Sequence, residues 1–292
     1  MTIDTKILLR IFLIIALISA SQAIYCQSNQ GENIFSPENR LKFGNYLYKE
    51  KDYLRALPEL KEYLKTKTDD TTQFRFADCF FRLNRFSEAE YNFRTLFSSP
   101  TLADESRLKF FESLFFDNDY AALREYSERN SYSDFKYSNE VNRLKYISFF
   151  FDDSILPKEN EMLNAFPDSV RPQILNYYLL KKFPPAKSVA TAAILSAIIP
   201  GAGKIYTGEI GDGITAFAAT ALSAYLAYSN FHNDHQFRGW LFTGLTAFFY
   251  GGNIYGSAAS AQIYNVRMKF DFQKSVKLFF EERNYFLPEI NF

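Results

Sequence analysis

Three long stretches without a charged side chain lie in the last third of this chain, and they limit what it can fold into. They run from Ser188 to Gly203 (16 residues), from Gly213 to Phe231 (19 residues) and from Gly239 to Val266 (28 residues). Because a helix needs about 20 mostly apolar residues to cross a bilayer, the second and third are long enough and the first is marginal. We therefore expect residues 188–266 to form a membrane domain, followed by a basic tail over residues 267–292.

The polar segment between the second and third stretches, His232 to Arg238, is short, so the two stretches are expected to form a transmembrane helical hairpin. Aromatic residues, which favour the headgroup boundary, gather at this end of the hairpin. They are Tyr225, Tyr228, Phe231, Trp240 and Phe242. The alternative is a hairpin buried in a soluble core, since Ala, Ser and Thr are only modestly hydrophobic.

Small residues recur four apart in the third stretch, at Gly252, Gly256 and Ser260. In lipid, such ridges let helices pack backbone to backbone. We expect these three residues to pack helices together, either within one chain or between two copies in a homo-oligomer.

A run of proline and glycine ends the first stretch, and it predicts a tight turn after a short helix. Its motif residues are Pro200, Gly201, Gly203, Lys204, Tyr206 and Gly208. A structural turn is the preferred interpretation, and a contact of Lys204 and Tyr206 with a lipid headgroup or a partner is the alternative. A nucleotide-binding loop is excluded, because it would need glycine and Ser or Thr where this chain has Ile198 and Ile205.

This motif resembles the Pro-Gly-x-Gly-x-x-Tyr-x-Gly signature of a family of small two-span membrane domains in bacteria, some of which carry helical repeats upstream. The resemblance covers residues 188–262 and implies a bacterial cell-envelope protein without a known activity. Lys204 departs from the family pattern, where glutamine is commoner, so the polar contacts at this position are expected to differ.

Upstream, small residues recur with a period of 33, at Gly44 and Ala77 and again at Ala56 and Ala89. Two helices approach closely only where the side chains at their crossing are small. The pattern resembles tetratricopeptide repeats, whose period is about 34 residues. We expect residues 36–182 to form an all-α repeat domain with a degenerate third unit. Its groove would bind a protein partner, unless its aromatic residues only fill the interior.

The first 23 residues have the pattern of a secretory signal peptide. Lys6 and Arg10 accompany an apolar run, and Ser21-Gln22-Ala23 offers a cleavage site. An uncleaved anchor is the alternative. Export would place the repeat domain on the periplasmic side of the inner membrane. Lipidation of Cys26 is disfavoured because Tyr25 precedes it, and Cys79 is expected to be buried rather than paired with Cys26.

Composition argues against several classes of function. The 33 basic and 33 acidic side chains balance, so nucleic acid is not expected as a partner. The only histidines, His232 and His235, are too few for a metal site, which needs three or four ligands. The sequence holds no nucleophile beside a base. We therefore expect no catalytic, cofactor or metal site.

The preferred function is a membrane-anchored scaffold that presents a tetratricopeptide-like repeat to other proteins of the bacterial cell envelope. The second hypothesis is an accessory factor for envelope assembly or transport, acting through the glycine motif and the hairpin. A lipid-modifying enzyme ranks third. The basic tail prefers the cytoplasm, so two or three crossings remain open, and three would require residues 188–206 to span as well.

Overall fold

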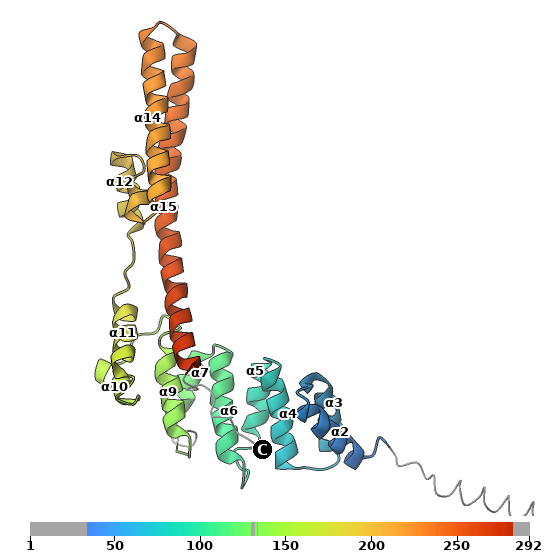
Figure 1. The fold of residues 1–292 in the computed structure, drawn as a ribbon. Coiled ribbons are helices and arrows are strands. Elements are labelled where there is room, and N and C mark those ends of the chain that lie inside the picture. The colour runs from blue at the N-terminus through green and yellow to red at the C-terminus, as the bar shows by residue number, and fades with distance from the viewer. Residues whose placement is uncertain (1–33, 130–131, 133, 283–292) are drawn as a thin grey trace, which may run out of the picture. The chain divides into compact units, whose positions relative to one another are not determined.

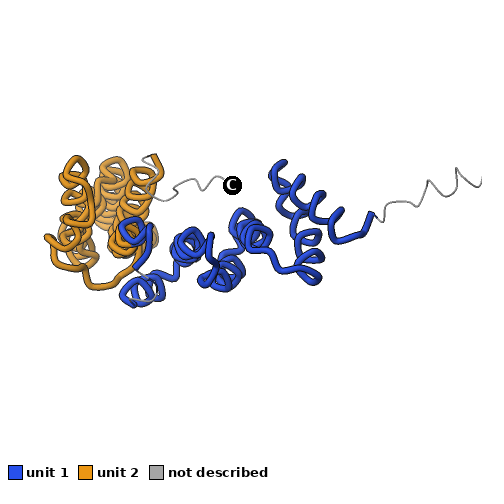
Figure 2. The backbone as a smooth tube through the Cα atoms, turned by 90° about the horizontal axis from the view of Figure 1, so that it is seen from below, with its two compact units in different colours: residues 1–141 blue, residues 142–292 orange. Residues whose placement is uncertain are grey.

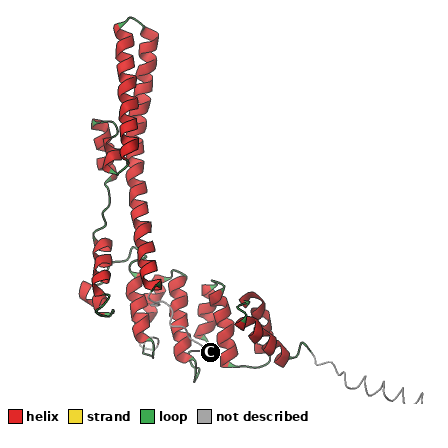
Figure 3. Cartoon of the chain, viewed as in Figure 1, coloured by secondary structure: helices red, strands yellow, loops and turns green. Residues whose placement is uncertain are grey.

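The structure, a computed structural model, describes residues 34–129, 132 and 134–282. Every regular element among these residues is an α-helix (Figures 1 and 3). The all-α fold class is therefore confirmed for the described part of the chain. The expected signal peptide, residues 1–23, and Cys26 lie outside the described residues.

The chain divides into two compact units, unit 1 (Met1–Val141) and unit 2 (Asn142–Phe292) (Figure 2). This division differs from the expected domain boundary between Lys182 and Ser188. Residues 142–182 belong to unit 2 because they pack against the far end of its longest helix.

Unit 1 is a series of antiparallel helix pairs. Its helices are α2 (Pro37–Lys49), α3 (Tyr53–Leu64), α4 (Asp70–Arg82), α5 (Phe86–Arg94), α6 (Ala103–Phe116) and α7 (Tyr120–Ser127). Each helix packs on the next along the chain (Figure 1). Aspartates cap several of them: the Asp52 carboxylate accepts a hydrogen bond from the Arg55 N–H at 3.2 Å, and Asp119 does the same for Ala122 at 3.0 Å.

The loops inside the three helix pairs share one backbone geometry. Each contains a residue in the left-handed region: Lys51 (φ 62°), Asn84 (φ 58°) and Asn118 (φ 63°). The N–H of the following residue donates to a carbonyl near the end of the preceding helix at 2.9 Å, in Asp52 to Leu47, Arg85 to Phe80 and Asp119 to Leu114. The degenerate third pair therefore repeats the connection of the first two.

The structure places the four predicted repeat residues in the unit 1 core. Ala56, Ala77 and Ala89 are fully buried. A Cβ on Gly44 would stand 2.8 Å from the Leu60 Cδ2 atom, so this helix crossing leaves room for a glycine and little more. Around them pack large apolar side chains, which include Leu60, Phe74, Phe93, Phe110, Phe111 and Leu123.

Polar and charged side chains of α2, α4 and α6 lie close together in unit 1, and Asp78, Lys109 and Glu112 among them are buried. The Tyr48 hydroxyl donates to the Asp78 carboxylate at 2.7 Å, and Arg82 forms an ion pair with the same group at 3.2 Å. On α6, Lys109 Nζ lies 2.7 Å from the Glu112 carboxylate, and Glu112 is completely buried. Burial raises the pKa of Glu112 from 4.5 to about 7, although the Lys109 ammonium opposes the shift.

Unit 2 contains a long helical hairpin with shorter helices beside it. Its elements are α9 (Ser138–Ser148, which begins at the end of unit 1), α10 (Glu159–Asn164), α11 (Arg171–Lys182), α12 (Val189–Ile198), α13 (Ala202–Tyr206), α14 (Ile210–His232) and α15 (Gln236–Glu281). α14 and α15 run antiparallel, and α12 and α13 pack on α15 (Figure 1).

The turn between α14 and α15 is tight. Asp234 is in the left-handed region (φ 58°), and the His235 N–H donates to the Asn230 carbonyl at 2.9 Å. The Phe231 ring covers Gly239, where a Cβ would stand 2.6 Å from ring carbons, and it meets the Trp240 ring edge-on at 5.5 Å.

Among the described helices, α14 alone is both long and apolar enough to cross a membrane. α12 is apolar but too short. α15 is long enough, but the second span expected over residues 239–266 does not reach the same hydropathy because it carries Gly, Ser, Thr, Asn and Tyr. The expectation of two apolar spans is therefore met for the first of them only.

The segment expected as a basic tail continues α15 up to Glu281. The Tyr177 hydroxyl lies 3.1 Å from the Ser275 hydroxyl, and the Phe272 ring packs edge-on against Phe150 at 6.0 Å. Lys269 Nζ forms an ion pair with Asp153 at 2.9 Å. Sequence reasoning took these basic residues for a separate tail, but the aromatic side chains between them hold α15 against residues 150–182.

Candidate functional site

The motif singled out from the sequence forms a compact turn that we call the glycine turn, residues 199–208, between α12 and α14. α12 ends with a hydrogen bond from the Ile199 N–H to the Leu195 carbonyl at 2.9 Å, and Pro200 follows it. Gly201 then adopts φ +89°, a left-handed conformation that favours glycine. A Cβ on Gly201 would stand 2.0 Å from the carbonyl oxygen of Gly213, so the start of α14 lies directly against this turn.

Gly203 lies at the crossing of α12, α13 and α15. A Cβ there would stand 1.9 Å from the Ala192 carbonyl oxygen and 2.7 Å from Ser257 Cβ. The Gly203 N–H donates to the Ser196 hydroxyl at 2.9 Å, and this hydroxyl lies 2.6 Å from the Ser257 hydroxyl. Both serines are fully buried, so this hydrogen-bond chain joins three helices in the interior.

Tyr206 holds the segment that leads into α12. Its hydroxyl accepts a hydrogen bond from the Ser188 N–H at 3.3 Å, and Lys187 Nζ lies 4.6 Å from the centre of its ring. The Lys187 backbone in turn exchanges two hydrogen bonds with the Asn265 side chain, at 2.7 and 2.9 Å. This entry segment is therefore tied to both α13 and α15.

The end of the glycine turn is joined to α15 by a carboxylate. Gly208 has φ +92° and open space where a Cβ would stand. After it, the Glu209 carboxylate accepts a hydrogen bond from the Ser260 hydroxyl at 2.6 Å. The role of Gly208 is therefore conformational, whereas Gly201 and Gly203 also permit close approach.

Lys204 extends along the surface of α15. Its Cε and Nζ atoms lie 3.4 and 3.8 Å from the place that a Cβ on Gly256 would occupy. Next to it is a hollow of about 190 Å³ that is also lined by Asn253. Asn253 is 4% exposed, and neither polar atom of its amide has a hydrogen-bond partner.

Of the three residues predicted to pack helices, only Ser260 joins two helices among the described residues of unit 2. A Cβ on Gly252 would meet nothing within 4 Å, and Gly256 faces the Lys204 side chain. Ser260 forms the hydrogen bond to Glu209. Among the described residues of unit 2, Gly252 and Gly256 make no backbone-to-backbone contact with another helix, and the close approaches occur at Gly201, Gly203 and Gly213.

Sequence reasoning missed the polar residues of this site, which are Ser196, Asn253 and Ser257. Asn253 and Ser257 are four residues apart and therefore lie on one face of α15. A polar face within an otherwise apolar stretch is the sequence signal for such a site. Serine is also a small residue, so this signal is easily mistaken for a helix-packing ridge.

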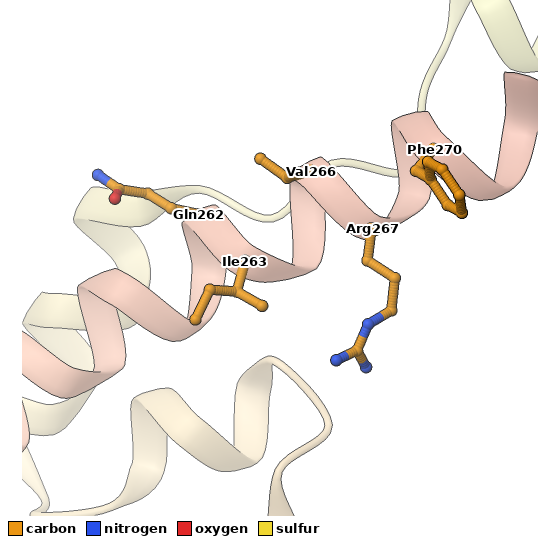
Figure 4. A pocket seen from close by; sticks show the side chains of 5 residues that line it. All are labelled: Gln262, Ile263, Val266, Arg267 and Phe270. Carbon is orange, nitrogen blue, oxygen red and sulfur yellow. The ribbon is translucent and has the colours of Figure 1, made fainter.

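Near the end of its uncharged stretch, α15 presents apolar side chains beside Gln262 and Arg267 (Figure 4). Ile263, Val266 and Phe270 are exposed there and line a hollow of about 510 Å³ with Gln262 and Arg267. All five side chains belong to one helix. Arg267 is the first charged residue after the uncharged stretch, so it marks a polar end to the apolar surface.

No group of three or more metal-ligating side chains occurs among the described residues. His232 and His235 lie at the turn between α14 and α15, where the His232 ring stacks on Tyr228 at 6.1 Å. The functional groups at the glycine turn are the ammonium groups of Lys187 and Lys204, the amides of Asn253 and Asn265, the Glu209 carboxylate and several hydroxyls.

Comparison with known proteins identified no matching family model, no similar curated protein and no similar solved structure. The resemblances of the two motifs therefore remain predictions.

Proposed function

We propose that unit 2 anchors this chain in a bilayer through a two-span hairpin, and that unit 1 is a tetratricopeptide-like docking scaffold in the bacterial cell envelope. The observation that carries the proposal is the exposure of α14. Only 22% of its most apolar 18-residue window is buried in the protein. A core helix of a soluble protein would be mostly buried, and a secretory signal would lie near the amino terminus, so lipid is the environment that fits α14.

Three polar residues of α15 face inward, which makes them compatible with a second span. Asn253, Ser257 and Ser260 are buried, whereas Trp240, Leu241, Phe248, Tyr255, Ile263 and Val266 are exposed. Mean hydropathy counts all sides of a helix equally, but only the outer side of a packed hairpin meets lipid. This outer side of α15 supports the second span.

Two crossings fit the structure better than three. α12 has 10 residues, which gives it a length of about 15 Å against the roughly 30 Å of a hydrocarbon core. In addition, α11 and the far end of α15 contact each other through Tyr177 and Ser275. The segments before and after the membrane block therefore belong on one side of the bilayer.

Two sequence features favour opposite sides of the membrane for the segments that flank the membrane block. Basic residues flank the membrane block on both ends, and they favour the cytoplasm. They include Lys181, Lys182, Lys187, Arg267 and Lys269. The amino-terminal segment favours export. We assign the dominant role to export, which places unit 1 on the periplasmic side of the inner membrane. A reporter fused after Phe292 should then be active in the periplasm, and cytoplasmic activity would contradict this assignment.

Membrane anchoring is tested by a charge on the exposed face of α14. The full chain should resist extraction from membranes with alkaline carbonate. Leu222→Arg places a charge at a position that is 60% exposed, and an arginine at the centre of a span costs about 2.5–3.5 kcal/mol on insertion scales. Carbonate should release this variant, whereas Tyr91→Arg in unit 1 should stay bound. Release of the unaltered chain would refute anchoring.

Docking is supported by large apolar side chains that unit 1 leaves exposed, at Phe43, Tyr46, Leu54 and Tyr91. A photoreactive residue in place of Tyr46 in the full chain should give a discrete protein adduct in cells. The same residue at Lys61, on the next helix, is the control. Identical adduct patterns from both positions would contradict a specific docking face.

The second candidate is an accessory factor that acts through the glycine turn. The unpartnered Asn253 amide beside Lys204 favours it, because the turn then offers a site of its own. In that case a variant such as Gly203→Ala would abolish function while the adduct from Tyr46 persists.

A further inference from the structure

We propose that Lys204 and Asn253 form a binding site for the anionic head group of a membrane lipid. The site lies where α13, α14 and α15 meet, inside unit 2. The proposal rests on the membrane anchoring proposed above, and it adds a ligand class that anchoring alone does not require.

The site has walls of two kinds. One ammonium group and one amide provide polarity, and the remaining walls are aromatic rings and small residues. The hollow measures about 190 Å³ and is lined by Lys204, Ala216, Ala219, Phe248, Phe249, Gly252 and Asn253. A few polar groups in an apolar hollow are typical of a site that orients an amphiphilic ligand.

Asn253 is the observation that points to a ligand. Its side chain is 4% exposed, and its amide nitrogen and amide oxygen both lack a hydrogen-bond partner. Buried polar groups are nearly always paired, so an amide unpaired at both ends indicates that a group from outside the chain pairs with it. The amide nitrogen can donate two hydrogen bonds to an oxyanion.

Lys204 supplies the charge. Its side chain is half-buried, and no carboxylate forms an ion pair with it in the described part of the chain. Glu209, five residues further along, instead accepts a hydrogen bond from Ser260 at 2.6 Å. Beside lipid an ammonium group without a counter-charge is costly, so an anion is the ligand that suits it.

The depth of the hollow favours a lipid as the source of that anion. Asp212 is the last charged residue before the uncharged stretch of α14, and Ala216 follows it by about one helical turn. On its α14 side, the hollow thus lies about one helical turn from the polar end of the proposed span, near the level of the phosphate head groups. Phe217 and Phe248 are exposed next to it and offer a surface for acyl chains.

The test uses the full chain in detergent micelles. Native mass spectrometry measures the binding of phosphatidylglycerol, with phosphatidylcholine and inorganic phosphate as the other two probes. We expect saturable binding of phosphatidylglycerol and weak binding of the other two. Loss of one charge-assisted hydrogen bond should weaken this binding about tenfold.

Two pairs of variants separate the site from general effects. Lys204→Gln should weaken the binding about tenfold, whereas Lys274→Gln removes the same charge from an exposed position on α15 and should leave the binding unchanged. Gly252→Leu should fill the hollow, whereas Gly251→Leu should not, although a Cβ has open space at both positions. Asn253→Leu should keep the fold, measured by circular dichroism, and also lose the binding.

Equal binding by Lys204→Gln and the unaltered chain would overturn the proposal, as would equal binding by Gly252→Leu and Gly251→Leu. Binding of inorganic phosphate without a preference for phosphatidylglycerol over phosphatidylcholine would overturn the lipid as the source of the anion. Carbonate extraction of the same variants separates the two proposals. Retention in the membrane without lipid selectivity refutes only this site, and release of the unaltered chain refutes the anchor.

Discussion

The backbones of Gly201 and Gly213 touch: a Cβ on Gly201 would stand 2.0 Å from the Gly213 carbonyl oxygen, and a Cβ on Gly213 would stand 2.7 Å from the Gly201 carbonyl oxygen. Neither position admits any other residue without a shift of the backbone. This contact fixes the start of α14 against the turn that ends α12, and thereby sets the position of Lys204 between them.

Gly201→Ala should therefore destabilise unit 2 more than Gly208→Ala. Both glycines have positive φ, at +89° and +92°, so both substitutions bear a conformational cost of about 1–2 kcal/mol. Only Gly201→Ala adds a clash with backbone. Unfolding in mixed detergent micelles, followed by circular dichroism, measures the difference, and equal stability of the two variants would contradict the close contact.

Ser196→Ala should cost about 1–3 kcal/mol, because it leaves the buried Gly203 N–H without an acceptor. Ser223→Ala is the matched control. Ser223 is also buried, but its hydroxyl donates only to the Ala219 carbonyl of its own helix. The same unfolding measurement should show a much smaller loss for Ser223→Ala, and a similar loss in both would refute the interhelical hydrogen-bond chain.

The stability of unit 1 should fall as the pH rises from about 4.5 to about 7. Burial raises the pKa of Glu112 from 4.5 to about 7, so over this range the folded state holds a proton that the unfolded state has released. The loss is at most about 3.5 kcal/mol, since each pKa unit corresponds to about 1.4 kcal/mol.

Glu112→Gln should remove this pH dependence, and Glu50→Gln at an exposed position should leave it in place. Urea unfolding of the full chain at several pH values measures both. Lys109, Asp78 and Arg82 also act on Glu112, and their influence is part of the shift. An unchanged pH profile in Glu112→Gln would show that another group is responsible.

Phe280→Ala should free the end of α15. Phe280 is fully buried and packs on Phe166 at 5.9 Å, and removing such a ring costs about 3–5 kcal/mol. Trypsin should then cleave faster after Lys274 and Lys277 than in the unaltered chain. Leu278→Ala, at a half-exposed position two residues away, should leave the rate unchanged, and equal cleavage of both variants would show that this end of α15 is not held.

The helical content and the glycine turn could be predicted because they depend on local patterns. Helical spacing indicates helices wherever the core is continuous, and Pro200-Gly201 is a strong local signal for a turn. The loop residues Lys51, Asn84 and Asn118 share a left-handed conformation at the repeat spacing, but only two of them are asparagine, so the sequence signal was weak.

Contacts between distant segments were beyond the reach of the sequence. Gly213 and Gly252 both lie in apolar stretches, yet one touches backbone and the other faces open space. The basic residues near Lys269 resembled a free tail. Phe272 and Phe280 instead pack on Phe150 and Phe166, which holds the end of α15 against the shorter helices of the same unit. Which partner a small or aromatic residue meets depends on the whole fold.

The most direct test of the anchor is the sidedness of the two ends of the hairpin. Single cysteines at Asn233, in the turn between α14 and α15, and at Lys274, near the end of α15, are introduced into the chain with Cys26 replaced by serine. Cys79 is buried and should not react. A maleimide that cannot cross membranes should label one of the two positions in intact cells or spheroplasts and the other only after permeabilisation. Labelling of both positions from the same side would contradict a two-span hairpin.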